Sequence, residues 1–108
     1  MHQFSDILPT LPSIDHLQAI ELYDTNGSVA GIIENKPGSS GSVKVYHHLW
    51  KKWGCINSEA AKEGLSLYAE HTDDARANPG KHPNIDRLFE VIEQNATLTV
   101  ETIPVGVA

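Results

Sequence analysis

The residues best suited to chemistry are two histidines and their acidic neighbours in the second half of the chain. His71 and Asp74 are three positions apart, Glu70 precedes them, and the segment 81–84 returns a second histidine, His82, after a short connection. Imidazole and carboxylate groups are ligands of zinc, iron, nickel and manganese. These four residues are therefore a candidate metal site for a divalent transition-metal cofactor, although their spacing matches no diagnostic metal motif.

The favoured alternative is a structural role for His71. On a helix at about 100° per residue, His71 falls within a stripe of small apolar side chains that includes Gly64, Leu67 and Ala75. There it would be a core histidine bonded to a backbone carbonyl or to Asp74. In the catalytic reading, Glu70 or His47 would complete the ligand set.

A second candidate is an anion site at the start of a basic helix. The loop 38–42, rich in glycine and serine, leads into the helix, whose free N–H groups could hold a phosphate or carboxylate. The loop lacks the Lys-Ser/Thr ending of a Walker loop. The alternative is a solvated basic face after a flexible linker. The candidate anion-binding residues are Lys36, Ser39, Ser40, Ser42, Lys44, His47 and His48.

Other kinds of chemistry find little support. Cys55 has no partner histidine in sequence and is expected to be buried and inert. Trp50 and Trp53 have the spacing of core or interface residues. No nucleophile elbow and no paired carboxylates for acid–base catalysis are present.

The elements that would position these residues begin with a hairpin. Segment 19–23 alternates apolar and polar residues as a strand does. Asn26-Gly27 favours a type I′ turn, after which segment 28–34 is predicted to return as the partner strand. Before them, residues 1–18 are expected to form an irregular arm, because Pro9 and Pro12 stop helix growth.

Three helices and a last strand follow. Apolar residues recur at helical spacing over 43–53, 58–77 and 85–94, and 97–103 alternates as a strand, followed by a frayed tail at 105–108. The order ββαααβ predicts a single α+β domain spanning 1–108. In it, a small antiparallel sheet, made of the hairpin and the C-terminal strand, carries three helices on one face.

Charge is unevenly distributed along the chain. The formal net charge is −6, yet every Lys and Arg lies between Lys36 and Arg87. Overall acidity argues against general nucleic-acid binding, and the chain has neither an apolar run long enough for a membrane nor an export signal. We expect a cytoplasmic protein. Its short sheet edges favour a homodimer.

Three runs of sequence carry a resemblance. Residues 33–42, 68–76 and 79–86 resemble a small bacterial protein family of unknown function, over essentially the whole chain. The resemblance implies a stand-alone bacterial protein and assigns no catalytic residues. Two functions are therefore compared. One is a non-enzymatic, self-associating module that binds a ligand or partner, and the other is a metal-binding site or metal-dependent enzyme site built on His71, Asp74 and His82.

Overall fold

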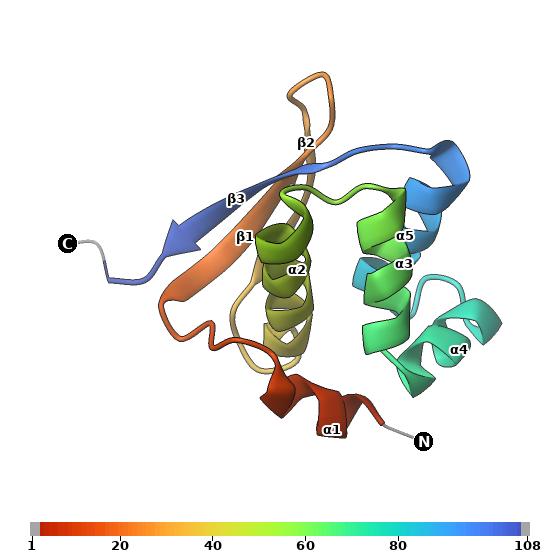
Figure 1. Cartoon of the computed structure of the whole chain (residues 1–108), viewed down its shortest axis with the longest axis horizontal. Helices are drawn as coiled ribbons and strands as arrows, with labels where there is room; N and C mark the ends of the chain where they lie inside the picture. The colour runs from red at the N-terminus through yellow and green to blue at the C-terminus, as the bar shows by residue number, and fades with distance from the viewer. Residues whose placement is uncertain (1–2, 107–108) are drawn as a thin grey trace.

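The computed structural model describes residues 3–106 and forms an α+β fold, with a three-stranded antiparallel sheet on one side and helices on the other (Figure 1). In chain order the elements are α1 (Phe4–Ile7), the 3-10 helix η1 (Leu8–Thr10), β1 (Leu17–Tyr23), β2 (Val29–Glu34), α2 (Ser40–Trp53), α3 (Ser58–Leu67), α4 (Glu70–Ala77), α5 (Pro83–Gln94) and β3 (Thr99–Pro104).

The sheet has the order β2-β1-β3, and both pairings are antiparallel. The hairpin and the position of the last strand beside it are therefore as predicted. The hairpin turn differs from the expected type I′, because Gly27 has positive φ and Asn26 does not. Instead the Asp24 carboxylate accepts hydrogen bonds from the N–H groups of Asn26 and Ser28, which closes a longer turn.

The prediction of three helices is wrong in number. The expected helix 58–77 breaks at Tyr68 and Ala69 into α3 and α4, and the N-terminal arm contains the short helix α1. Ala69 has φ 53° and ψ −120°, which a helix cannot accommodate. Tertiary packing causes the break, because Tyr68 and Thr72 both turn inward and the Thr72 hydroxyl donates to the Leu65 carbonyl.

Local sequence explains the ends of the other helices. Gly54 adopts φ 80° after α2, and Asn95 adopts φ 50° after α5, which are usual left-handed helix ends. Asn57 caps α3 by accepting a hydrogen bond from Ala60 N–H. Pro83 occupies the first turn of α5, so this helix begins earlier than the predicted cap at Asn84.

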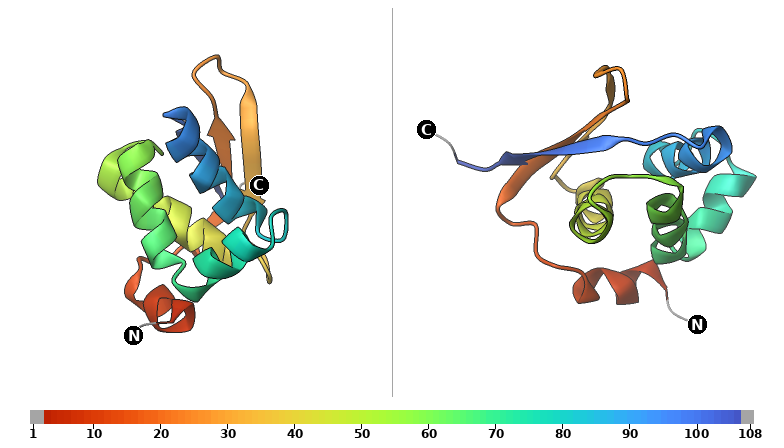
Figure 2. Two further views of the ribbon diagram at one scale, coloured as in Figure 1. Left: turned by 90° about the vertical axis from the view of Figure 1, so that its right-hand side faces the viewer. Right: turned by 45° about the horizontal axis from the view of Figure 1, so that its top comes forward.

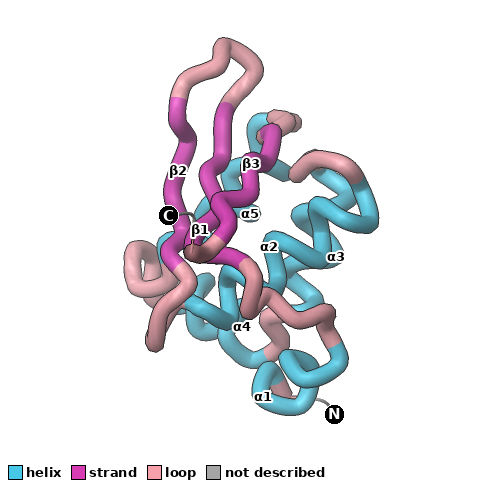
Figure 3. The backbone as a smooth tube through the Cα atoms, turned by 90° about the vertical axis from the view of Figure 1, so that its left-hand side faces the viewer, coloured by secondary structure: helices cyan, strands magenta, loops and turns pink. Residues whose placement is uncertain are grey.

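The core lies between the sheet and α2, with α3 and α5 packed behind (Figure 2). The small residues of α3 allow this close packing: a Cβ on Gly64 would stand 2.7 Å from Leu88 Cδ1 and 3.0 Å from Leu49 Cδ1. The views in Figures 2 and 3 agree that the helices cover one face of the sheet. The other face is left without a covering layer.

The pairing of β1 with β3 continues one residue beyond the strand ends. Val105 N–H donates to the His16 carbonyl, so the tail predicted to fray is tied at its first residue. Val107 and Ala108 of that prediction, and Met1 and His2 of the predicted arm, lie outside the described residues.

Candidate functional site

The two candidate sites of the sequence meet at one cavity of about 390 Å³. Its walls come from four segments that are distant in sequence: the N-terminal arm, the first turn of α2, the junction of α3 with α4, and the connection into α5. The lining side chains that carry polar or aromatic chemistry are Phe4, Ser40, Ser42, Tyr68, His71, Lys81, His82 and Asn84.

The α3–α4 junction sets the inner wall of the cavity. Because the chain turns sharply at Ala69, Tyr68 stays buried, and its hydroxyl donates to Ser42 Oγ at 2.7 Å. Burial raises the pKa of Tyr68 well above its usual range, so the phenol remains protonated and acts as a donor. This hydrogen bond joins the start of α2 to the end of α3 beneath the cavity.

The N-terminal arm forms another wall. The Phe4 ring stacks on Tyr68 with centroids 5.2 Å apart and meets the His71 ring edge-on at 5.2 Å. Phe4 N–H donates to Glu70 Oε1 at 2.7 Å, and this bond is the first cause of the lowered pKa of Glu70. On its other side Phe4 lies over Gly41, where a Cβ would be only 3.2 Å from the ring. A glycine is needed at this close approach.

The connection into α5 is held from two sides. Tyr46, whose pKa burial raises to about 12, donates its hydroxyl proton to the Asn84 carbonyl at 2.5 Å. Asp74 Oδ2 lies 2.6 Å from His82 Nε2 and 3.0 Å from Lys81 Nζ. These contacts, led by the hydrogen bond from His82, lower the pKa of Asp74 to about 2. Asp74 is therefore ionised at neutral pH, and its carboxylate orients the Lys81 and His82 side chains.

The structure brings Asp74 and His82, two of the candidate metal ligands, into contact, but the predicted position of His71 is wrong. The His71 side chain is 42% exposed and lines the cavity instead of the apolar stripe, because the helix that defined the stripe is broken. Its ring lies 5.7 Å from the His82 ring, and its Nε2 lies 3.9 Å from Glu70 Oε2.

These side chains contact one another in succession and do not surround a common position where a metal ion could bind. Asp74 contacts His82, His82 faces His71, and His71 approaches Glu70, which is already bound to the N-terminal arm. Within residues 3–106, no group of three or more His, Cys, Asp and Glu side chains is arranged to hold a metal ion. The expected metal centre therefore has no ligand set in the part of the chain that the structure describes.

The predicted anion-binding residues are dispersed. Only Ser40 and Ser42 line the cavity. Lys36 pairs with Glu34 at 3.3 Å, the Ser39 hydroxyl donates to the Glu34 carbonyl, and Lys44 Nζ donates to the Leu8 carbonyl at 2.9 Å. The loop shapes the cavity mainly through its backbone.

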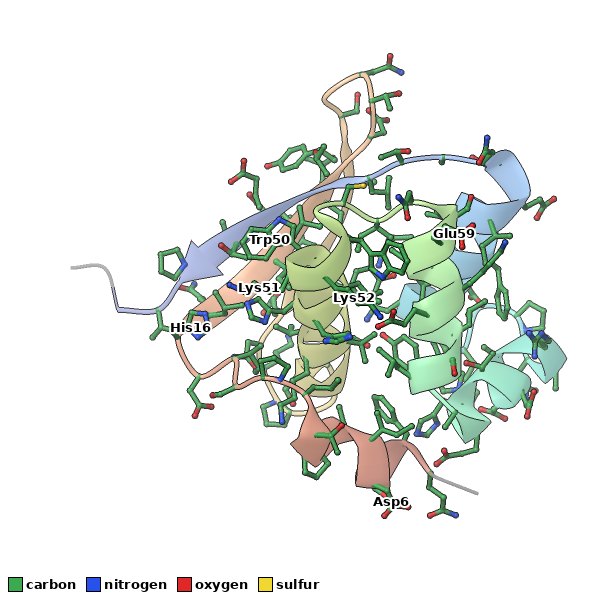
Figure 4. All side chains as sticks on the ribbon, in the orientation of Figure 1. Asp6, His16, Trp50, Lys51, Lys52 and Glu59 are labelled. Atoms are coloured by element: carbon green, nitrogen blue, oxygen red, sulfur yellow. The ribbon has the colours of Figure 1, made fainter. Side chains whose placement is uncertain are left out.

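The two histidines of the predicted basic face lie on different sides of α2, away from this cavity. His48 Nε2 contacts Glu63 Oε2 at 2.7 Å on α3, where Lys52 also binds Glu63. His47 is buried against the His16 and Trp50 rings, although it was expected on the solvent side. Figure 4 shows the division, with His16, Trp50 and Lys51 toward the sheet and Lys52 toward α3.

Most residues of the cavity wall are absent from the sequence-based site, among them Phe4, Tyr68 and Lys81. Lys81 stands beside His82 in a segment already singled out, and its position next to a candidate ligand is the available sequence signal. Phe4 and Tyr68 read as apolar packing residues by their spacing. Nothing in the sequence indicates that they meet, because they are 64 positions apart.

Comparison with known proteins gives one match. The family model described as "Uncharacterized protein conserved in bacteria (DUF2322)" matches residues 4–102. The chain belongs to this family. No curated protein and no solved structure matches it. The DUF2322 match confirms the predicted resemblance to a bacterial family of unknown function, and it spans every residue of the cavity.

Among the described residues, no helix combines the length and the apolar character needed to cross a membrane.

Proposed function

We propose that the protein binds a small anionic molecule, bearing a phosphate or carboxylate group, in the cavity between the N-terminal arm, α2 and α4. The observation that carries the proposal is the meeting of Lys81, His71 and His82 with the first turn of α2 around one cavity. A cavity of about 390 Å³ falls within the range of small-molecule sites.

Electrostatics support an anion as the ligand. Lys81 supplies a full positive charge, and the imidazoles of His71 and His82 supply further hydrogen-bonding groups. Within residues 3–106, the N–H groups of Gly41 and Ser42 donate to no acceptor, as expected in a first helical turn. These donors add partial positive charge to the wall that the first turn of α2 forms.

The cavity wall is preorganised, which supports a role in ligand binding. Asp74 holds Lys81 and His82 in place, Tyr68 holds Ser42, and Tyr46 holds the backbone at Asn84. The polar groups of the wall are therefore fixed before a ligand arrives, which reduces the entropy lost on binding.

The test is a titration of the ¹⁵N-labelled protein with inorganic phosphate and, separately, with succinate. We expect saturable amide shifts at 40–42 and 81–85. Lys81→Gln should weaken binding about tenfold or more, because one charge-assisted hydrogen bond contributes roughly 1.5–3 kcal/mol. Lys62→Gln is the matched control, because the Lys62 side chain is 60% exposed and that of Lys81 is 61% exposed, and both pair with a carboxylate.

Two results would count against the proposal. One is the absence of saturable shifts with either anion at millimolar concentration. The other is equal weakening by Lys81→Gln and Lys62→Gln, which would indicate a general charge effect.

Self-association is a second candidate, supported by the free edge of β2. This strand contains neither Lys nor Pro, the residues that usually protect an edge, and it exposes Val29 and Ile32. A second copy could pair along this edge. Analytical ultracentrifugation should then give a dimer mass for the native chain and a monomer mass for Ile32→Lys; a monomer at all concentrations for both would remove this candidate.

A further inference from the structure

The outer face of the sheet is a surface separate from the cavity. In the strand registers, Glu21 of β1 lies opposite Ile32 of β2 and Glu101 of β3. On the same face, Ala19 lies opposite Glu34 and Ile103, and Tyr23 lies opposite Val29 and Thr99. The alternate residues Ile20 and Leu22 point to the core. The outer face thus consists of Ala19, Glu21, Tyr23, Val29, Ile32, Glu34, Thr99, Glu101 and Ile103.

Apolar side chains on this face are open to solvent. Val29 is 58% exposed and Ile32 is 55% exposed, and the helices lie on the opposite side of the sheet (Figure 2). Large exposed apolar residues that share one uncovered surface are typical of an interaction site.

The same face carries carboxylates without neutralising partners. Glu21 and Glu101 are direct cross-strand neighbours, a like-charge pair that destabilises a sheet. Neither forms an ion pair with any residue of 3–106, whereas Glu34 pairs only with the exposed Lys36. The hydrogen bond to Glu21, followed by desolvation and then by the charges of Glu21 and Glu101, raises the pKa of Tyr23.

The sequence explains why no cation balances this pair. All three strands come from the flanks of the chain, and residues 17–34 and 99–104 contain no Lys, Arg or His. The bases are confined to the helical half and its connections. The outer face of the sheet is therefore negatively charged because the three strands that form it carry no basic residues.

We propose that the outer face of the sheet docks a basic amphipathic segment of a partner protein, with apolar side chains against Val29 and Ile32 and Lys or Arg side chains against Glu21 and Glu101. Charge complementarity selects this occupant. A second copy placed face to face would bring the same glutamates together, and nucleic acid or an anionic lipid surface would be repelled.

The test uses the full ¹⁵N-labelled chain and a defined probe, an 18-residue helical peptide of leucine and lysine arranged with one apolar face. We expect saturable amide shifts confined to β1, β2 and β3, which weaken as salt is raised. The double variant Glu21→Gln/Glu101→Gln should reduce affinity at least tenfold. Glu90→Gln/Glu93→Gln, which removes the same charge from exposed positions of α5, is the control.

Several outcomes would overturn the proposal: shifts centred on the helices, equal losses in the two double variants, or equal binding of a peptide in which every lysine is replaced by glutamate. Light scattering on the free chain gives a further check. A dimer that Glu21→Gln/Glu101→Gln strengthens would assign the face to a second copy instead.

Discussion

The cavity and the outer face of the sheet treat their charged groups in opposite ways. At the cavity, Asp74 is paired with both Lys81 and His82, and buried tyrosines fix the surrounding walls. On the sheet, Glu21 and Glu101 face each other without a cation among the described residues. The comparison indicates that the cavity is organised in the free protein, whereas the sheet face is left with an unfavourable charge arrangement that a partner would relieve.

Removing the buried wall of the cavity should have the largest effect. Tyr68→Ala is expected to lower the free energy of unfolding by about 3 kcal/mol, because it deletes a buried aromatic ring that Phe4 stacks upon. Tyr68→Phe, which deletes only the donor to Ser42, should lose about 1 kcal/mol. Urea denaturation measures both, and a loss below 1 kcal/mol for Tyr68→Ala would show that the wall is not firmly packed.

The backbone beside the cavity should carry strain that the sheet lacks. Ala69 has φ 53° and ψ −120°, a conformation that costs a non-glycine residue roughly 1–3 kcal/mol. Ala69→Gly should therefore raise stability by about 1 kcal/mol after the added flexibility of the unfolded chain is subtracted. Ala77→Gly, at the end of α4, is the control and should not stabilise; equal effects would remove the argument from strain.

Acidification should act on the helical layer and not on the sheet face, because the described histidines all lie outside the sheet strands. Burial, followed by the charges of His16, Lys51 and His48, lowers the pKa of His47 below 6.5. The unfolded chain then binds a proton before the folded chain does, so stability is full above about pH 6.5 and falls as the pH drops below it. Thermal unfolding at pH 7.5 and 5.5 measures this fall, and His47→Phe should reduce it. An unchanged pH dependence in that variant would assign the loss to other groups.

The smallest effect is expected on the sheet face. Glu21→Gln removes the like-charge pair with Glu101 and should stabilise the free protein by about 0.3 kcal/mol at low salt, with less gain at high salt. Paired urea curves at two salt concentrations test this. A destabilised variant would contradict this prediction and would mean that the hydrogen bond from the Tyr23 hydroxyl to Glu21 Oε1, at 2.9 Å, contributes more than the repulsion from Glu101 costs.

The sequence predicts best those features that depend on local periodicity and end signals. The hairpin, the helix ending at Trp53 and the last strand were predicted because each has a clear apolar pattern. The break at Ala69 was not predictable in this way, since α3 and α4 both bury the residues that a single helix would bury. Burial of Tyr68 against Ser42, and not local propensity, decides the path of the chain there.

Part of the candidate site was predictable for the same reason. Asp74 and His82 are eight positions apart across a short connection, so their contact follows from proximity in sequence. The cavity itself needs the arm, α2 and the start of α5 to meet, which only tertiary structure provides. His47 shows the converse error: a polar residue between Tyr46 and His48 was assigned to solvent, yet the His16 ring covers it.

The central position of β1 has a consequence for how the chain folds. Tyr23 and Thr99 are 76 residues apart in sequence and lie side by side in the sheet. At a synthesis rate of about 5–20 residues per second, β1 would wait roughly 4–15 s on the ribosome for its second neighbour. During that interval its backbone edge toward β3 is unpaired, and such an edge can pair with the wrong chain. Deletion of β3 is therefore expected to cause aggregation of the chain during synthesis, because the edge of β1 would stay unpaired.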